Sequence, residues 1–237
     1  MREQRPERGP DSGRAGTREP APGGAGRVRR VAGVTTYAGL ILDFGGVVTT
    51  DFYGALDAFS ERAGLGDRAF VRALRENPEG RAALAAVERG EVPQREFERT
   101  MGRLLGVDDA GLLAEALADL KPRPEVIDLT RRARARGVRA AALSNSWGTG
   151  EYDPYAGWDL DGLFDAVVIS DQVGLRKPDP EIFKLTAANL GLAPSDCLFV
   201  DDTEHNLPGA AGLGMGTLFF TGAATEVDEI ERLVGIA

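Results

Sequence analysis

The sequence is poor in thiols: its 237 residues include a single cysteine, Cys197. One thiol excludes an intrachain disulfide and a zinc site built on cysteines, and it fits a reducing compartment. Long apolar runs are missing as well. The uncharged stretch 31–42 is too short to span a bilayer, and the stretch 206–225 contains five glycines and a proline. We therefore expect a cytoplasmic protein with no membrane partner.

Positive charge is scarce over most of the chain. The net charge is −9, and the first 36 residues contribute +4 from eight Arg against four acids, so residues 37–237 carry −13. Such an acidic body argues against nucleic acid as a partner. An anionic substrate would need local positive charge from a lysine, from helix N-termini or from a metal ion.

The composition changes along the chain and suggests its domains. Residues 1–36 are rich in Arg, Pro and Gly, with few large apolar side chains, which predicts a disordered tail. Residues 51–120 carry apolar side chains at helical spacing. A crossover between parallel strands needs only about a dozen residues or more. We therefore predict a helical cap subdomain at 51–120, inserted into a core formed by 37–50 and 121–237.

The predicted core alternates short apolar runs with helical patterns. Strands are expected at the run that enters Asp43 and at 138–143, 166–170, 197–200 and 217–220, with helices between them. This alternation predicts an α/β fold with a doubly wound, Rossmann-like parallel sheet. The helix expected at 124–136 has an arginine-rich face, which is more often a solvated surface than a nucleic-acid site.

Three of these strands end in polar side chains: Asp43, then Ser144 and Asn145, then Asp201 and Asp202. In parallel α/β sheets the carboxyl ends of the strands form the ligand-binding edge. Acids gathered there repel one another unless a cation binds. Hard oxygen ligands of this kind suit Mg²⁺. The pattern therefore predicts a magnesium site at this edge.

The same residues suggest phosphate chemistry. Ser144 and Asn145 offer neutral donors for phosphate oxygens, and Lys177 offers a positive charge. Asp43 could then attack phosphorus and form an aspartyl-phosphate. Each piece alone is common in turns and helix caps, and Asp43 by itself fits an ordinary strand-to-loop turn. Their order and spacing together are more specific.

Over about residues 40–220 the sequence resembles the haloacid dehalogenase-like hydrolase superfamily, in the branch with a helical cap after the first strand. The motifs that carry the resemblance are Asp43-Phe44-Gly45-Gly46-Val47, Leu143-Ser144-Asn145, Arg176-Lys177-Pro178-Asp179-Pro180 and Phe199-Val200-Asp201-Asp202-Thr203-Glu204-His205-Asn206.

The resemblance implies a role for each matching residue. Asp43 would be the nucleophile, Ser144 would bind phosphate, and Lys177 would stabilise the nucleophile and the transferring group. Asp202, helped by Asp201, would hold Mg²⁺. The Gly45 carbonyl would be a further metal ligand. The resemblance also implies that the cap opens and closes over the site.

One position departs from the family pattern. Phosphatases of this family usually carry a second Asp, a general acid and base, where this chain has Gly45. Protonation of the leaving group contributes roughly 10²–10⁴-fold to rate. Sugar 1-phosphates, which have good leaving groups, need that proton less. His205 and Asp51 are candidate substitutes by proximity in sequence, although His205 also fits an exposed residue in the first turn of a helix.

We therefore predict a Mg²⁺-dependent phosphatase of a small phosphorylated metabolite. The sequence does not indicate an oligomeric state. One alternative is a metal-free 2-haloacid dehalogenase. That branch usually has an aromatic residue at the Gly45 position and a Ser/Asn pattern in place of Asp201 and Asp202. Another alternative is a non-catalytic binding protein on the same fold. A loop with Trp147, Tyr152, Tyr155 and Trp158 could line the substrate pocket or pack against the cap.

Overall fold

The computed structural model describes residues 29–31 and 34–237. Strands β1 (Arg29–Val31) and β2 (Val34–Thr36) pair antiparallel. This pairing corrects the predicted disordered tail at its C-terminal end, and the rest of that tail lies outside the described residues. Short β-branched segments such as Val34–Thr36 suit a pleated strand.

The centre of the molecule is a five-stranded parallel sheet in the order β5-β4-β3-β6-β7. The strands are β3 (Gly39–Leu42), β4 (Arg139–Ser144), β5 (Ala166–Ile169), β6 (Cys197–Asp201) and β7 (Gly216–Phe219). All of β3 is buried, as its unbroken apolar run requires of a central strand covered on both faces. The predicted doubly wound α/β fold is confirmed.

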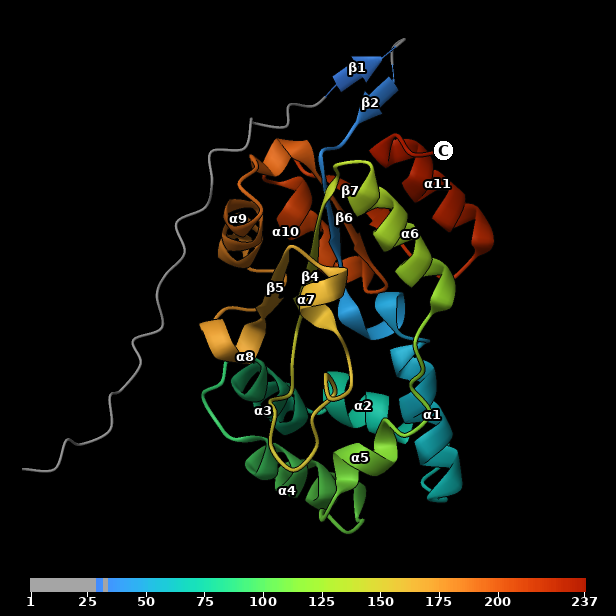
Figure 1. The fold of residues 1–237 in the computed structure, drawn as a ribbon. Coiled ribbons are helices and arrows are strands. Elements are labelled where there is room, and N and C mark those ends of the chain that lie inside the picture. The colour runs from blue at the N-terminus through green and yellow to red at the C-terminus, as the bar shows by residue number, and fades with distance from the viewer. Residues whose placement is uncertain (1–28, 32–33) are drawn as a thin grey trace, which may run out of the picture.

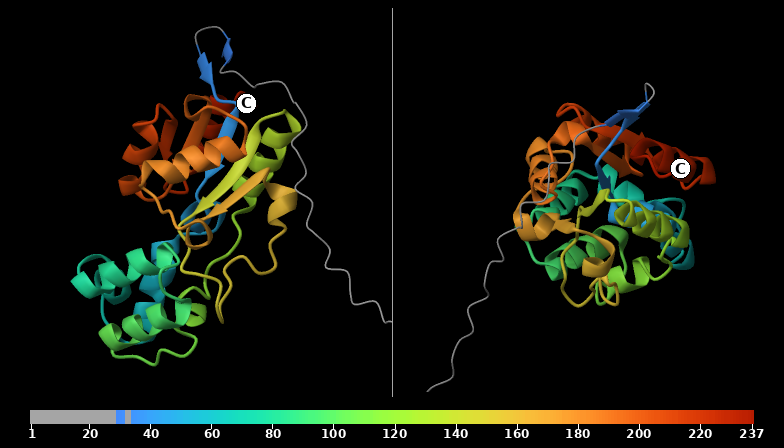
Figure 2. Two further views of the ribbon diagram at one scale, coloured as in Figure 1. Left: turned by 90° about the vertical axis from the view of Figure 1, so that its left-hand side faces the viewer. Right: turned by 45° about the horizontal axis from the view of Figure 1, so that its top comes forward.

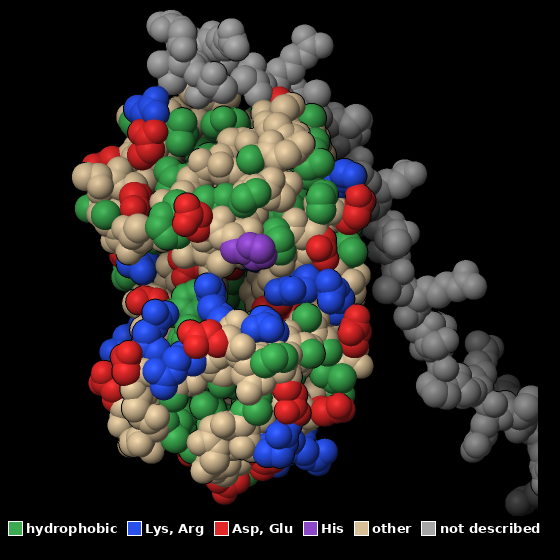
Figure 3. All heavy atoms as spheres, turned by 180° about the vertical axis from the view of Figure 1, so that it is seen from behind, with side chains coloured by type: hydrophobic (Ala, Val, Ile, Leu, Met, Phe, Trp, Pro, Cys, Tyr) green, Lys and Arg blue, Asp and Glu red, His purple; other side chains and the backbone are tan. Residues whose placement is uncertain are grey.

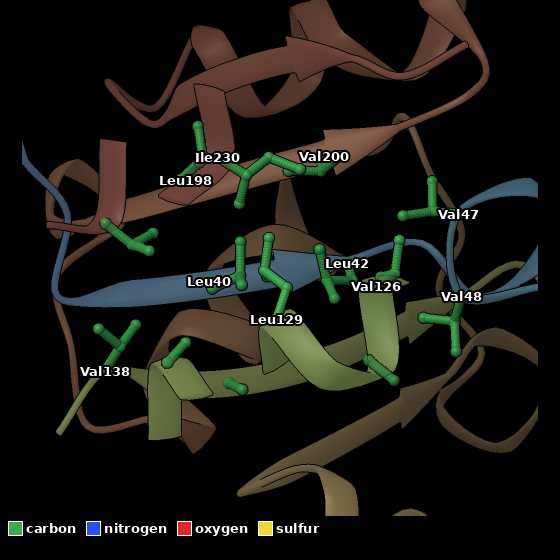
Figure 4. Packing of buried hydrophobic residues seen from close by; sticks show 14 of the residues in the cluster. Leu40, Leu42, Val47, Val48, Val126, Leu129, Val138, Leu198, Val200 and Ile230 are labelled. Atoms are coloured by element: carbon green, nitrogen blue, oxygen red, sulfur yellow. The ribbon is translucent and has the colours of Figure 1, made fainter. Parts of the chain in front are cut away.

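Helices cover both faces of this sheet (Figure 1). On one face, Leu40 and Leu42 of β3 share a core with α6 (Pro124–Ala135) and α11 (Ala224–Val234), as Figure 4 shows. On the other face, Ile41 and Phe199 lie in a core with residues of α9 (Pro180–Asn189) and α10 (Leu207–Ala211). Alternate residues of one strand therefore lie in two different apolar cores, because successive side chains point to opposite faces of the sheet.

A second body of helices, here called the helical lobe, occupies residues 52–117. It contains α1 (Phe52–Arg62), α2 (Ala69–Arg75), α3 (Pro78–Glu88), α4 (Gln94–Leu105) and α5 (Leu112–Ala116). The lobe has its own apolar core around Phe70, Phe97 and Met101. It lies beyond the carboxyl ends of the sheet strands (Figures 1 and 2).

Short segments complete the core of the protein. The turn Phe44–Val48 follows β3, and the short helices α7 (Leu160–Leu163) and α8 (Ser170–Val173) flank β5. Single 3₁₀ turns at Pro194–Asp196 and Glu204–Asn206 lie on either side of β6. None of the helices among the described residues is long and apolar enough to cross a membrane.

Candidate active site

The three strands whose ends carry polar residues are direct neighbours in the sheet. β3 pairs in parallel with both β4 and β6. The backbone N–H of Asp43 donates to the carbonyl of Val200, 2.9 Å away, so the end of β3 is tied to the end of β6. Asp43, Ser144 and Asp201 therefore meet at one edge, as their positions at strand ends predict.

The carboxylate of Asp43 is held through one of its two oxygens. Oδ1 accepts hydrogen bonds from the backbone N–H of Phe44 at 2.7 Å and from Nζ of Lys177 at 2.7 Å. Oδ2 has no hydrogen-bond partner within the described part of the chain. Asp43 also lines the cavity between the core and the helical lobe. A carboxylate fixed through one oxygen presents the other to a ligand.

Lys177 supplies a buried positive charge beside that carboxylate. Its side chain is 1% exposed, and Nζ also donates to Oδ2 of Asp201 at 2.8 Å. Burial lowers its pKa, but the charges of Asp201 and Asp43 outweigh burial, so the pKa is raised and the ammonium stays protonated.

The side chain of Asn145 holds the Lys177 segment in place. Its amide Oδ1 accepts from the backbone N–H of Lys177 at 2.8 Å, and its Nδ2 donates to the Lys177 carbonyl at 3.1 Å. The sequence predicted that Asn145 binds phosphate. In the structure both ends of its amide instead contact the Lys177 backbone.

Three carboxylates cluster beside Lys177. Asp43, Asp201 and Asp202 each offer an oxygen within 4.8 Å of the others. Burial and the neighbouring Asp201 raise the pKa of Asp43 well above its usual value, while Lys177 lowers it. The same two causes raise the pKa of Asp202 to about 6. Buried acids in this arrangement are poorly neutralised by one lysine.

Within the cluster, Asp201 and Asp202 have different surroundings. Asp201 is fully buried, and its oxygens accept from Thr203 N–H at 2.7 Å and from Asn206 Nδ2 at 3.0 and 3.1 Å. Asp202 is partly buried and lines the cavity. The contact of Asn206 was missed at the sequence level. Asn206 belongs to the motif that begins at Phe199, which is the signal that could have found it.

The two glycines after Asp43 allow the acids to approach. Gly46 has φ of +84°, and a Cβ there would lie 1.9 Å from Oδ2 of Asp202. Only glycine fits, both for the backbone angle and for the space. A Cβ on Gly45 would lie 3.2 Å from the ring of Phe52. The first residue of α1 thus packs where a larger side chain at position 45 would project.

This donor set fits a magnesium ion. Asp43 and Asp202 line the cavity with the buried Asp201 beside them, and hard oxygen ligands with a high negative charge are what Mg²⁺ prefers. A cation would also relieve the repulsion that raises the pKa values of Asp43 and Asp202.

Ser144 is oriented by an aromatic loop. Its Oγ accepts a hydrogen bond from the hydroxyl of Tyr155 at 2.8 Å. Burial raises the pKa of Tyr155 to about 12, so its hydroxyl is a donor at neutral pH. Because Ser144 accepts from Tyr155, its own proton is available to another acceptor. Tyr155 in turn packs on Phe44, with ring centres 5.0 Å apart.

The cavity between core and lobe has a volume of about 640 Å³, within the usual range for small-molecule sites. All four aromatic residues of the loop line the cavity: Trp147, Tyr152, Tyr155 and Trp158. Packing against the cap was predicted as the alternative, and only Trp147 and Tyr152 pack against the core of the helical lobe. Tyr155 and Trp158 instead pack against the core between the sheet, α6 and α11.

The two candidate proton-transfer residues differ in position. His205 is exposed and lines the cavity. Asp51 is not among the lining residues. Its Oδ1 accepts from Gly54 N–H at 3.0 Å, which makes Asp51 the N-cap of α1.

An ion pair joins the lobe to the core beside the acids. Nε of Arg176 lies 2.5 Å from Oε2 of Glu88, at the end of α3. Burial raises the pKa of Glu88, and Arg176 opposes that shift. No local sequence pattern predicts this ion pair, because its partners lie 88 residues apart.

Comparisons with known proteins agree with this geometry. Residues 37–214 match a family model described as haloacid dehalogenase-like hydrolase. A phosphoserine phosphatase from Thermus thermophilus is 32% identical over 142 residues, which are 57% of this chain and 57% of that protein. A glyceraldehyde 3-phosphate phosphatase from Methanopyrus kandleri is 29% identical over 140 residues, covering 55% and 60%. The chain therefore spans less than two thirds of either relative.

A solved structure shares the fold. The crystal structure of a HAD family enzyme from Bacteroides thetaiotaomicron, in complex with magnesium and inorganic phosphate, superimposes with a TM-score of 0.57. It is 24% identical, and the match covers 78% of this chain and 95% of that one. At this identity the likeness supports the fold alone.

Proposed function

Because the chain belongs to the haloacid dehalogenase-like hydrolases, we propose that it is a Mg²⁺-dependent phosphatase that hydrolyses a small phosphorylated metabolite. The observation that carries the proposal is Oδ2 of Asp43, which has no hydrogen-bond partner among the described residues and lies at a cavity that Lys177 and Asp202 also line. The likeness to two phosphatases supports the same reaction class.

Asp43 is the nucleophile in this proposal. Its Oδ2 attacks phosphorus, the bond from phosphorus to the leaving oxygen breaks, and an aspartyl-phosphate forms. Water then attacks the phosphorus of this intermediate and releases inorganic phosphate and the free carboxylate. Lys177, which contacts Oδ1, favours the ionised form of Asp43 and balances charge on the transferring group. Ser144 donates its free proton to a phosphoryl oxygen.

The residues that would hold Mg²⁺ are Asp43, Asp202 and the carbonyl of Gly45, with Asp201 beside them. Bound there, the ion would neutralise the phosphate and the acids together. Because Asp201 is fully buried and bonded to Lys177 and Asn206, it acts mainly on the position of its neighbours. Asn145 likewise acts by positioning Lys177.

The residue that would protonate the leaving group is the least well defined part of the site. The Phe52 ring packs against Gly45, where related phosphatases carry an acid, and Asp51 is not among the lining residues of the cavity. His205 is the remaining candidate, since it lines the cavity. We therefore expect a preference for phosphate esters with good leaving groups.

The metal-free dehalogenase is the weaker alternative. Its attack on carbon needs no cation, yet Asp201 and Asp202 add two carboxylates beside the nucleophile. A non-catalytic binding protein would not need a buried lysine paired to a carboxylate with one oxygen unpartnered. Each alternative predicts an assay result that differs from that of the phosphatase.

The test is phosphate release from sugar and nucleotide phosphates, with Mg²⁺ or with EDTA, for the wild type and for Asp43→Asn. We expect release that needs both Mg²⁺ and Asp43. Asp51→Asn is the matched control, because it removes one carboxylate nearby while asparagine still caps α1. Metal-independent release of halide from chloroacids would support the dehalogenase instead. No turnover of either class would support the binding protein.

A further inference from the structure

The cavity has two chemically different ends. At the core end it is lined by the catalytic candidates Asp43, Ser144 and Lys177. At the lobe end the polar lining includes Arg75 and Arg81. Figure 3 shows the hollow between core and lobe, with Lys and Arg side chains gathered on its lobe side. The walls between the two ends include apolar and aromatic side chains: Phe52, Leu74, Leu84, Leu117 and Trp147.

No carboxylate among the described residues neutralises the charges at the lobe end. Of the other cations that line the cavity, Lys177 pairs with Asp43 and Arg176 pairs with Glu88. Arg75, Arg81 and Lys121 also line it, and none of these three forms an ion pair with a carboxylate of the described residues. The ion pairs among the described residues are formed by other cations: Arg62, Arg68, Arg89, Arg95, Arg103, Arg123, Arg132, Arg134, Arg139, Arg176, Lys177, Lys184 and Arg232.

Two of these three cations are nevertheless fixed in place. The guanidinium of Arg75 lies over the ring of Tyr53, with Cζ 4.5 Å from the ring centre, and donates to the Tyr53 hydroxyl. Nη1 of Arg81 donates to the carbonyls of Arg75 at 3.1 Å and Glu76 at 2.8 Å, at the end of α2. Neutral groups therefore hold both guanidinium groups and leave their charge available to a ligand.

A concentration of free positive charge is unexpected in a body that carries −13 over residues 37–237. Phosphate binding does not account for it, because Lys177 and the Mg²⁺ site already serve the phosphate at the core end. A cavity of about 640 Å³ also has room for much more than a phosphate group. Two fixed guanidinium groups on the lobe side of the cavity fit a carboxylate or a second phosphate.

We propose that Arg75 and Arg81 bind a second anionic group of the substrate. The substrate is then a phosphomonoester that carries, besides the scissile phosphate, a carboxylate or a second phosphate. This inference rests on the proposed phosphatase function. It goes further by naming the substrate class and the residues that select it.

The test compares substrates that differ only in the second anion, in the presence of Mg²⁺. The pairs are 3-phosphoglycerate with glycerol 3-phosphate, O-phosphoserine with phosphoethanolamine, and glucose 1,6-bisphosphate with glucose 1-phosphate. For each pair the readout is the kcat/KM of the substrate with the second anion divided by the kcat/KM of the substrate without it. Hydrogen bonds to charged groups are strong enough to give a ratio of about 10 or more in the wild type. The pair with the largest ratio identifies the second anion.

The double variant Arg75→Gln/Arg81→Gln should lower the wild-type ratio about tenfold or more. The matched control is Arg99→Gln/Arg131→Gln, at two exposed arginines of α4 and α6 that are outside the cavity lining. It removes the same number of positive charges and should leave the ratio unchanged. Retention of the ratio in Arg75→Lys/Arg81→Lys, which keeps both charges, would confirm that charge at these positions is what matters.

Failure of this inference and failure of the phosphatase proposal give different results. Release that needs Mg²⁺ and Asp43, with a ratio near one in every pair, would overturn the anion subsite and leave the phosphatase intact. An equal fall of the ratio in Arg99→Gln/Arg131→Gln would show general charge steering and would also overturn the subsite. No release from any substrate would overturn both proposals.

Discussion

Replacing Lys177 with methionine should destabilise the fold by an amount that depends on pH. The Lys177 side chain is 1% exposed and lies 2.7 Å from Asp43 and 2.8 Å from Asp201. Removal of one partner from a buried ion pair costs about 3–5 kcal/mol, because the remaining charge stays buried without compensation. We expect a fall of that size in the free energy of unfolding at pH 7.5 in EDTA.

The sign of the pH dependence follows from the acids. Burial already raises the pKa of Asp43 above its usual value, and Lys177 is the main group that lowers it. Without Lys177 the pKa rises further, so the folded variant holds protons more tightly than the unfolded chain does. Protonation removes the buried charge, and the destabilisation should therefore shrink as the pH falls from 7.5 to 5.5.

The assay is urea unfolding followed by circular dichroism at both pH values, with Lys184→Met as the control. Lys184 is half exposed and, within the described part of the chain, pairs only with Glu181 on the surface of α9, so its loss should cost less than about 1 kcal/mol. A variant that is unfolded at pH 7.5 should regain structure at pH 5.5. An effect of Lys177→Met no larger than that of the control, or equal at the two pH values, would refute the reasoning.

Two further predictions concern the turn after β3 and the phosphate end of the site. Gly46→Ala adds a Cβ 1.9 Å from Oδ2 of Asp202, which we propose as a metal ligand. The affinity for Mg²⁺, measured by calorimetry, should therefore fall at least about tenfold. The control is Gly64→Ala. Gly64 also has positive φ but open space around it, so it should cost only backbone strain. Tyr155→Phe removes the hydrogen bond to Ser144 and should lower kcat/KM for phosphate esters several-fold, about the worth of one hydrogen bond. An unchanged kcat/KM would exclude Tyr155 as a positioning residue.

Much of the fold and the acid cluster could be predicted from local sequence. Gly39–Leu42 forms a strand buried on both faces, and Asp43 follows it directly. Parallel strands bring their carboxyl ends together, so Asp43, Ser144 and Asp201 had to converge once the strand order made β3, β4 and β6 neighbours. The spacing of apolar residues and the turn residues that follow specify such strands without information about the neighbouring strands.

The partners of the site residues depended on tertiary structure. Asn145 contacts the Lys177 backbone, and Tyr155 donates to Ser144. These contacts join residues 32 and 11 positions apart, through loops whose course no local pattern encodes.

The helical lobe illustrates the same limit. Its helices follow from apolar spacing, because each needs only one face to bury. The placement of Phe52 against Gly45 and of the guanidinium groups of Arg75 and Arg81 at the cavity depends on how the whole lobe packs over the sheet. Spacing along a helix fixes which side chains share a face, but only the packing of two bodies decides what that face meets.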